Sequence, residues 1–238
     1  MAKPKQIELP DCDPIPILYE DRAVMAIDKP AGWMLVPLSW RRTDFNLQAA
    51  LISSIEAGDF WARSRNLRFL RFIHRLDAET SGVLLFGKSP GAVRSLAELF
   101  ETRRMEKVYL AVMEGTPVAQ EWTVKEKIGP VPGQPGLMRI DAQQGKPAET
   151  LFKVVATHGA ETLVEGHPYT GRTHQIRLHL AHSGFPVVGD PLYGRKTTRS
   201  NEAMALRAVR LVYQDPFSRK RVDIRAPVDQ FLTEYGFG

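Results

Sequence analysis

The run of β-rich segments after residue 106 constrains the fold of this 238-residue chain more than any other feature. Four segments combine β-branched and aromatic residues with flanking turn residues, at 107–114, 121–128, 150–157 and 162–166. A doubly wound sheet would place a helix after each strand, whereas helices are indicated here between only some of the strands. The pattern therefore predicts an α+β fold with a largely antiparallel sheet.

Local signals predict the remaining elements. Ser89 has the residue type of a helix N-cap and Pro90 that of a first helical residue, so a helix is expected from there to Met105. Apolar spacing after Thr43 and Asp44 predicts another helix that ends at Gly58. We also expect a hairpin at 17–27, a Pro/Gly-rich loop at 129–136, strands at 206–213 and 219–225, and short helices at 173–182 and 228–235. Residues 1–16 hold four prolines and predict an extended arm before a folded domain at 17–238.

Composition and charge narrow the class of protein. The net charge of +5 and the pI near 9.4 favour a polyanionic partner. Cys12 is the only cysteine, which excludes an internal disulfide and a zinc site built on Cys-x-x-Cys pairs. The N-terminal residues lack the apolar region of a secretory signal, and no apolar run approaches the roughly 20 residues that span a bilayer. We therefore expect a cytoplasmic protein.

Two polar clusters carry the candidate chemistry. The first, His74 to Gly82, lies between apolar segments, where charges are unfavourable unless paired or solvated. The second, Gly171 to Leu180, is rich in arginine and histidine. A buried Asp77 would need a cationic partner to stay ionised, and Arg75 and Arg177 are the candidates. Arg172 and Arg177 lie five residues apart and on one helix would point in different directions, so only one is expected to meet the acid.

Five motifs occur along the chain in a fixed order. They read DKPAG at 28–32, HRLDAETSG at 74–82, KVYLA at 107–111, GRTHQIR at 171–177 and GDPLYG at 189–194. In this combination, which covers about residues 17 to 227, the chain resembles the RluA-type RNA pseudouridine synthases. The last motif by itself indicates only a turn. Family members often begin with an S4 domain; only 27 residues precede Asp28, so we expect a stand-alone member without that domain.

The resemblance implies a fold and a reaction. The fold is α+β, with a mixed, largely antiparallel central sheet in two joined halves, flanking helices and a central cleft; residues 17–238 would form this catalytic domain. The reaction breaks the N1–C1′ bond of a uridine in RNA, rotates the uracil and rejoins it through C5. It needs no redox change and no group donor, so we expect no cofactor and no metal.

The resemblance also assigns roles to residues. Asp77 is the expected nucleophile, Arg177 its cationic partner, and Tyr109 the residue that assists proton removal at C5. Arg75 is expected to displace the target nucleotide and occupy the gap. The other motif positions with an expected substrate-binding role are His74, Thr80, Arg172, His174 and Ile176. Attack on the ribose C1′ and attack on the base C6 are both compatible with the sequence.

The expected partner is a stem–loop of tRNA or rRNA, bound by a monomer that has no membrane contact. A base inside a stem must be flipped out, at a cost of a few kcal/mol, before its reacting atoms are accessible. Phosphate contacts and stacking by an inserted side chain can offset that cost. The planar guanidinium of an arginine suits such an insertion because it stacks and still donates hydrogen bonds.

Two other functions compete with this interpretation. A non-catalytic RNA-binding protein could share the fold, although it would not need Asp77, Tyr109 and Arg177 together. A nucleoside glycosidase would use two carboxylates. Glu79 is the only other acid near Asp77 and would share its face in an extended segment. Release of free uracil would identify that activity.

Some features have two readings. The arginines at 63, 65, 68 and 71 alternate with the aromatic residues at 60, 61, 69 and 72, which suits phosphate contact with base stacking and equally suits a solvated edge over a buried aromatic face. The basic segments 38–66 and 195–200 could likewise contact RNA or be solvated. Tyr109 taken alone would be read as a core tyrosine. The histidines at 174, 179 and 182 fit no zinc spacing and are interpreted as hydrogen-bonded structural residues.

Overall fold

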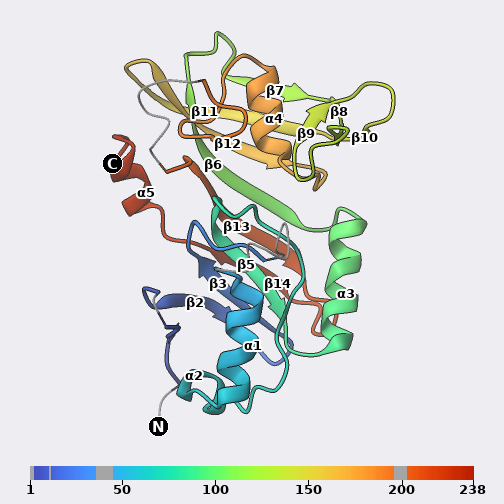
Figure 1. The fold of residues 1–238 in the computed structure, drawn as a ribbon, viewed down its shortest axis with the longest axis vertical. Helices are drawn as coiled ribbons and strands as arrows, with labels where there is room; N and C mark the ends of the chain where they lie inside the picture. Colours follow the sequence, from blue (N-terminus) through green and yellow to red (C-terminus); the bar gives the residue numbers. More distant parts are fainter. Residues whose placement is uncertain (1–2, 11, 36–44, 196–202) are drawn as a thin grey trace. The chain divides into compact units, whose positions relative to one another are not determined.

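The computed structural model describes residues 3–10, 12–35, 45–195 and 203–238. The chain divides into two compact units, which are described separately below. Unit 1 comprises Met1–Met105 with Leu211–Ala226, and unit 2 comprises Glu106–Arg210 with Pro227–Gly238. Strand β13, Leu206–Gln214, gives its first residues to unit 2 and its last residues to unit 1 (Figure 1). Thr43, Asp44, part of segment 38–66 and most of segment 195–200 lie outside the described residues.

Unit 1 is built on an antiparallel sheet. Its strands follow the order β1 (Gln6–Ile7), β2 (Ile15–Glu20), β3 (Val24–Lys29), β5 (Ser81–Gly87) and the end of β13; β4 (Arg71–Phe72) pairs with β5, and β14 (Arg221–Arg225) pairs with β13. The predicted hairpin is confirmed, with Ile17 opposite Ile27. Within the predicted extended arm, β1 forms a short strand and the side chain of Ile7 is fully buried.

The helices of unit 1 begin and end at local signals. Helix α3, Pro90–Glu101, starts as predicted, because the Ser89 side chain accepts a hydrogen bond from the Ala92 amide. It ends before Met105, since the chain turns through a left-handed Arg103. Helix α1, Leu47–Ala57, is capped by Asn46 rather than by Thr43 or Asp44, and it ends at Gly58 as expected. The short helix α2, Phe60–Arg63, had no sequence prediction. Leu96 and Leu99 of α3 pack against Val83 and Leu85 of β5.

Unit 2 contains two sheets. In the larger one, the first residues of β13 are followed by β6 (Glu106–Glu114), β12 (Glu161–Pro168), β11 (Thr150–His158) and β7 (Glu121–Val124). The smaller sheet has the order β10 (Lys146–Pro147), β8 (Lys127–Pro130) and β9 (Met138–Ile140). The single strand predicted at 121–128 is therefore wrong. It divides because Ile128 packs with Ala148 and Leu178 in a separate cluster, while Val124 belongs to the main core.

Two helices complete unit 2. Helix α4, Gln175–His182, packs on β11 and β12, where Ile176 and Leu180 join the main core (Figure 1). The turn after α4 passes through Gly184 with a φ of 88°, a left-handed conformation that favours glycine. Helix α5, Asp229–Glu234, adds Phe231 to the same core. The predicted α+β class with a mostly antiparallel sheet is confirmed. Within the described residues, no helix is both long and apolar enough to cross a membrane.

Candidate active site

Asp77 lies in a tight turn that leads into β5 of unit 1. The amide of Thr80 donates a hydrogen bond to the carbonyl of Asp77 at 3.2 Å, and Ala78 and Glu79 form the turn between them. The segment is therefore not extended, and the alternation that would put Asp77 and Glu79 on one face does not apply. This removes the geometric argument for a pair of carboxylates.

A buried lysine holds this turn through backbone atoms. Lys29, the last residue of β3, is fully buried, and its Nζ donates to the carbonyl oxygens of Pro30 at 3.0 Å, Ala78 at 2.9 Å and Thr80 at 2.9 Å. The amide of Gly32 donates to the same Ala78 carbonyl at 2.8 Å. Burial lowers the pKa of Lys29 to about 7, against the charges of Glu79 and Asp77, which raise it. Lys29 belongs to the DKPAG motif at 28–32, but the sequence predicted no role for it.

The other candidate residues of unit 1, namely His74, Arg75 and Thr80, lie close to Asp77 in the sequence. The Nε2 atom of His74 accepts a hydrogen bond from the Leu85 amide at 3.2 Å, and its ring stacks on Phe100 with a centroid distance of 4.7 Å. These contacts anchor His74 to β5 and α3. Arg75 is exposed. Thr80 is 1% exposed, and among the described residues its buried hydroxyl has no hydrogen-bond partner.

Arg177 of unit 2 forms a buried bidentate ion pair with Asp190. Its Nε donates to Oδ2 and its Nη2 to Oδ1, both at 2.7 Å, and the two side chains are 1% and 0% exposed. Burial raises the pKa of Asp190, but the hydrogen bonds and charge of Arg177 outweigh that effect and lower it below its usual range. The motif at 189–194 is a turn, as predicted, because Asp190 also accepts from the amides of Leu192 and Tyr193. Its pairing with Arg177 had no prediction.

Tyr193 links this ion pair to the start of α4. Its ring centroid lies 5.3 Å from Cζ of Arg177, and its hydroxyl lies 2.8 Å from Nδ1 of His174. The Met138 amide donates to the same hydroxyl at 3.1 Å, so the hydroxyl hydrogen is available for Nδ1. His174 adopts a left-handed conformation with a φ of 56° just before the helix. The guanidinium of Arg177 is thus held from two sides, by a carboxylate and by an aromatic ring.

A second hydrogen-bond network ties α4 to β11. Gln175 accepts from the Thr170 hydroxyl at 2.6 Å and donates to the Thr150 hydroxyl at 2.9 Å. The same Thr150 hydroxyl lies 2.9 Å from Nδ1 of His179, whose pKa is lowered by burial to about 4. His174 and His179 are therefore hydrogen-bonded structural residues, as interpreted from the sequence. No cluster of three or more His, Cys, Asp or Glu side chains that could hold a metal occurs in the described part of the chain.

Tyr109, Arg172 and Ile176 complete the candidate set in unit 2. Tyr109 is half-buried on β6, opposite Gly166 of β12, and packs against the main core. A Cβ at Gly166 would lie 3.6 Å from Ile176, which is 6% exposed. Arg172 precedes α4 and its Nε donates to the Pro147 carbonyl at 3.1 Å. Arg172 and Arg177 do not share a helix, because the Gln175 side chain accepts from the Arg172 amide and α4 begins only at Gln175.

Lys107 is a further buried cation next to these residues. It precedes Tyr109 by two positions on β6, so both side chains lie on the same face of the sheet. Its Nζ donates to the Thr170 carbonyl at 2.8 Å, and burial lowers its pKa to about 8. Lys107 thereby holds the chain just before Gly171, where the second polar cluster begins.

Comparisons with known proteins agree with this description. Residues 23–182 match the model of the RNA pseudouridylate synthase family. The ribosomal large subunit pseudouridine synthase C of Escherichia coli is 35% identical over 226 residues, which are 91% of this chain and 67% of the relative. An uncharacterized RNA pseudouridine synthase of Zymomonas mobilis is 34% identical, with 93% of this chain and 97% of the relative covered.

Solved structures extend the comparison to the fold. The human RNA pseudouridylate synthase domain containing 1 superposes with a TM-score of 0.72 at 29% identity, with coverage of 90% of this chain and 83% of the other. The human RNA pseudouridylate synthase domain containing 4 has the same fold, with a TM-score of 0.73 at 21% identity. The family model and the relatives together cover most of the chain, and we conclude that it belongs to the RNA pseudouridylate synthase family and isomerises uridine in RNA.

Proposed function

We propose that this enzyme converts a specific uridine in a ribosomal RNA stem–loop to pseudouridine, with Asp77 as its nucleophile. The observation that carries the proposal is the position of Asp77 in a turn in which one buried lysine binds the carbonyls of both Ala78 and Thr80. A nucleophile must be held in a defined geometry to gain from proximity. A turn braced from within the core meets that requirement.

The bond changes balance without any co-reactant. The carboxylate of Asp77 adds to the ribose C1′ or to the base C6, the N1–C1′ bond breaks, and the uracil rotates. The bond from C1′ to C5 then forms, the bond to Asp77 breaks and frees its carboxylate, C5 loses its proton with the assistance of Tyr109, and N1 gains a proton. Substrate and product have the same formula, so electrons and atoms are conserved.

Arg177 and Arg75 have different roles in this proposal. Arg177 supplies the positive charge that favours an ionised carboxylate during the reaction. Its bidentate pairing with Asp190 uses one N–H of Nε and one of Nη2, and this pairing fixes the plane of the guanidinium. Arg75 is exposed, as a residue must be if it is to enter the helix and replace the flipped nucleotide.

The proposal of a ribosomal substrate rests on the relatives. Synthase C of Escherichia coli is named for the large ribosomal subunit, and it aligns with 91% of this chain. Transfer RNA is the competing substrate. Ribosomal and transfer RNA can be separated by size before pseudouridine is located. One experiment therefore shows which of the two the enzyme modifies.

The test compares wild-type enzyme with D77N and D77A on ribosomal and transfer RNA purified from cells that lack the gene. Pseudouridine is labelled chemically and located by sequencing. We expect wild type to modify a discrete ribosomal uridine, and both variants to form no product while they retain folding by circular dichroism. E79Q, two residues away, is the matched control and is expected to stay active.

Other outcomes separate the alternatives. Modification of transfer RNA alone would overturn the ribosomal substrate. Activity in D77N and D77A would overturn the role of Asp77. Free uracil in place of pseudouridine, lost in both D77N and E79Q, would indicate a two-carboxylate glycosidase.

A further inference from the structure

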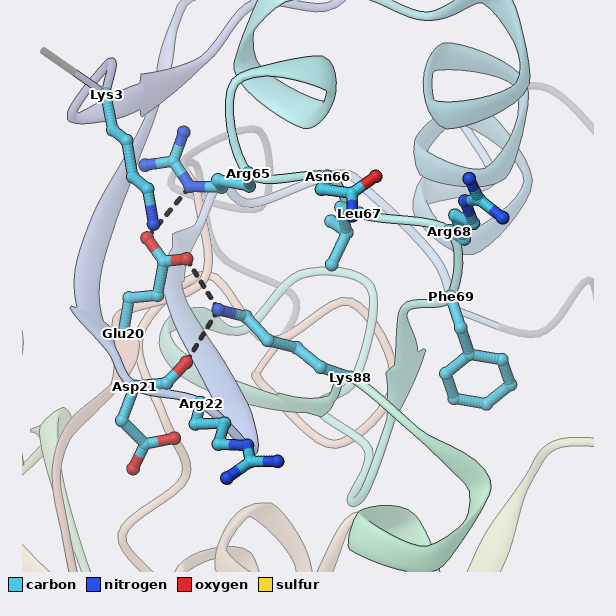
Figure 2. Close-up of a pocket in the computed structure, with 10 residues that line it drawn as sticks. All are labelled: Lys3, Glu20, Asp21, Arg22, Arg65, Asn66, Leu67, Arg68, Phe69 and Lys88. Atoms are coloured by element: carbon cyan, nitrogen blue, oxygen red, sulfur yellow. Dashed lines mark hydrogen bonds and ion pairs between the residues drawn. The ribbon is translucent and has the colours of Figure 1, made fainter.

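Unit 1 contains an open, strongly basic pocket at some distance from Asp77. Its cavity volume is about 560 Å³. The lining residues come from the β2–β3 turn, from the segment between α2 and β4, from the residue after β5 and from the N-terminal arm: Glu20, Asp21 and Arg22; Arg65, Asn66, Leu67, Arg68 and Phe69; Lys88; and Lys3 (Figure 2). The pocket thus joins segments that are remote in the sequence.

The two acidic residues of the pocket are already bound by other groups. Glu20 accepts from Arg65 at 2.8 Å and from Lys88 at 2.5 Å (Figure 2). The carboxylate of Asp21 is directed to the backbone of its own turn, where it accepts from the amides of Ala23 and Val24. Five cationic side chains face these two acids, so the pocket keeps an excess positive charge.

Two arginines supply accessible charge at this pocket. Arg22 and Arg68 are exposed, and neither has a hydrogen-bond or ion-pair partner among the residues that the structure describes. They come from different segments on either side of Lys88 in Figure 2. Lys88 and Arg65, by contrast, are largely buried and hold the frame of the pocket through Glu20.

The pocket lies at the opposite end of β5 from the catalytic turn. Strand β5 starts at Ser81, directly after the turn that contains Asp77, and ends at Gly87, directly before Lys88. Six residue steps at about 3.3 Å each separate its two ends by about 20 Å. A group bound at the pocket would therefore not reach the reacting uridine itself.

We infer that this pocket binds the phosphate backbone of the substrate RNA about 20 Å from the target uridine, as a second anchor. The inference rests on the proposed function, since the same RNA must reach both places. Exposed arginines with no acidic partner are the usual phosphate contacts of RNA-binding proteins. Within the arginine–aromatic alternation, Arg68 is thereby interpreted as a phosphate contact, whereas Trp61 is only 3% exposed and Arg65 is held internally by Glu20.

The test uses the double variant R22Q/R68Q and a matched control, R94Q/R221Q, which removes two exposed arginines of the same unit outside the pocket. Binding of bulk ribosomal RNA is measured by filter retention over a range of salt concentrations. We expect R22Q/R68Q to bind roughly tenfold more weakly and to reduce the slope of log affinity against log salt by about two. The control is expected to keep the wild-type slope.

A second measurement places the contact on the RNA. Pseudouridine formation is compared between a short hairpin that contains the modified uridine and a longer fragment that extends the stem by more than a helical turn. We expect the rate advantage of the longer RNA to fall about tenfold in R22Q/R68Q, because only that RNA reaches the pocket. The advantage should persist in R94Q/R221Q.

The outcomes separate this inference from the proposed function. If wild type forms no pseudouridine, the proposed function fails, and the binding measurement still decides about the pocket. If R22Q/R68Q has the salt slope of the control, the pocket does not bind RNA. A pocket that binds inorganic phosphate, with no loss of RNA affinity in R22Q/R68Q, would overturn the inference in favour of a small anion.

Discussion

Lys29 of unit 1 and Arg177 of unit 2 are both almost fully buried cations, and they are stabilised in different ways. Lys29 in unit 1 is fully buried and donates to three backbone carbonyls. Arg177 in unit 2 is 1% exposed and pairs through two hydrogen bonds with the carboxylate of Asp190. The first cation is surrounded by neutral dipoles, and the second is paired with an opposite charge.

This difference determines what each cation can hold in place. Carbonyl acceptors belong to the backbone, so Lys29 fixes the path of the chain on both sides of Glu79, just after Asp77. The carboxylate of Asp190 fixes a side chain, and thereby the plane and position of one guanidinium. Unit 1 therefore positions a turn, and unit 2 positions a single functional group.

Removal of the carboxylate should have the largest effect. D190A would leave Arg177 buried without its counter-ion, and we expect it to lower the free energy of unfolding by about 3–5 kcal/mol. Urea denaturation measures this loss. The double variant R177M/D190N removes the buried charge as well. Its loss of unfolding free energy should be smaller than the sum of the losses in R177M and D190N measured separately. Strict additivity would show that the ion pair does not couple these residues.

Removal of the lysine should have a smaller effect on stability. K29M removes the lysine donor from the Pro30, Ala78 and Thr80 carbonyls, of which Ala78 keeps the Gly32 amide, and it also removes a desolvated charge, so we expect a net loss of about 2 kcal/mol. The loss should be local to the catalytic turn, and hydrogen exchange at the amides of Gly32 and Thr80 should accelerate. Unchanged exchange at both amides would contradict the role of Lys29 as a brace for this turn.

The pH dependence of stability should also differ between the two cations. The pKa of Lys29 is about 7 in the folded chain, against about 10.4 in an unfolded one, so the unfolded state binds more protons between these values. The free energy of unfolding should therefore rise with pH across that window, by at most about 1.4 kcal/mol per pH unit. Lys107, whose pKa is about 8, should likewise make the free energy of unfolding rise with pH.

The difference between wild type and K29M isolates the contribution of Lys29. Measured by denaturant titration, this difference in the free energy of unfolding should grow between pH 7 and pH 9. Its slope should not exceed roughly 1.4 kcal/mol per pH unit. Asp190 contributes to stability in a different pH range. Its lowered pKa stabilises the fold at pH values above the ordinary carboxyl pKa, and this stability is lost as the pH falls through the lowered pKa. A wild-type minus K29M difference that is flat with pH would show that Lys29 is not desolvated.

The sequence predicts those parts of the fold that local signals control. The Ser89 cap, the stop at Gly58 and the hairpin at 17–27 depend on neighbouring residues, and all three are confirmed. The strand predicted at 121–128 is wrong, because the packing of Ile128 with Leu178 is a contact between distant residues. The same holds for β1, whose partner is eight or more residues away in the chain.

The residues of the candidate site also divide into those that local sequence signals indicate and those that depend on contacts between distant residues. Asp77 and Arg177 could be selected from the sequence because they lie within dense polar motifs. Lys29 acts on carbonyl groups, which every residue has, so no sequence pattern identifies its targets. Asp190 lies 13 positions from Arg177, in a segment that the sequence indicated only as a turn. One available signal was the apolar run at 24–27, which continues into the charged pair Asp28 and Lys29 within the same strand.

Two buried threonines provide the finest comparison between the units. The hydroxyl of Thr150 in unit 2 contacts Gln175 and His179, so T150V should lower the free energy of unfolding by about 1–2 kcal/mol. The hydroxyl of Thr80 in unit 1 has no partner among the described residues, so T80V should change stability by less than about 0.5 kcal/mol. Urea denaturation of both variants measures the difference. A stability loss in T80V as large as that in T150V would show that the Thr80 hydroxyl is hydrogen-bonded in the folded protein.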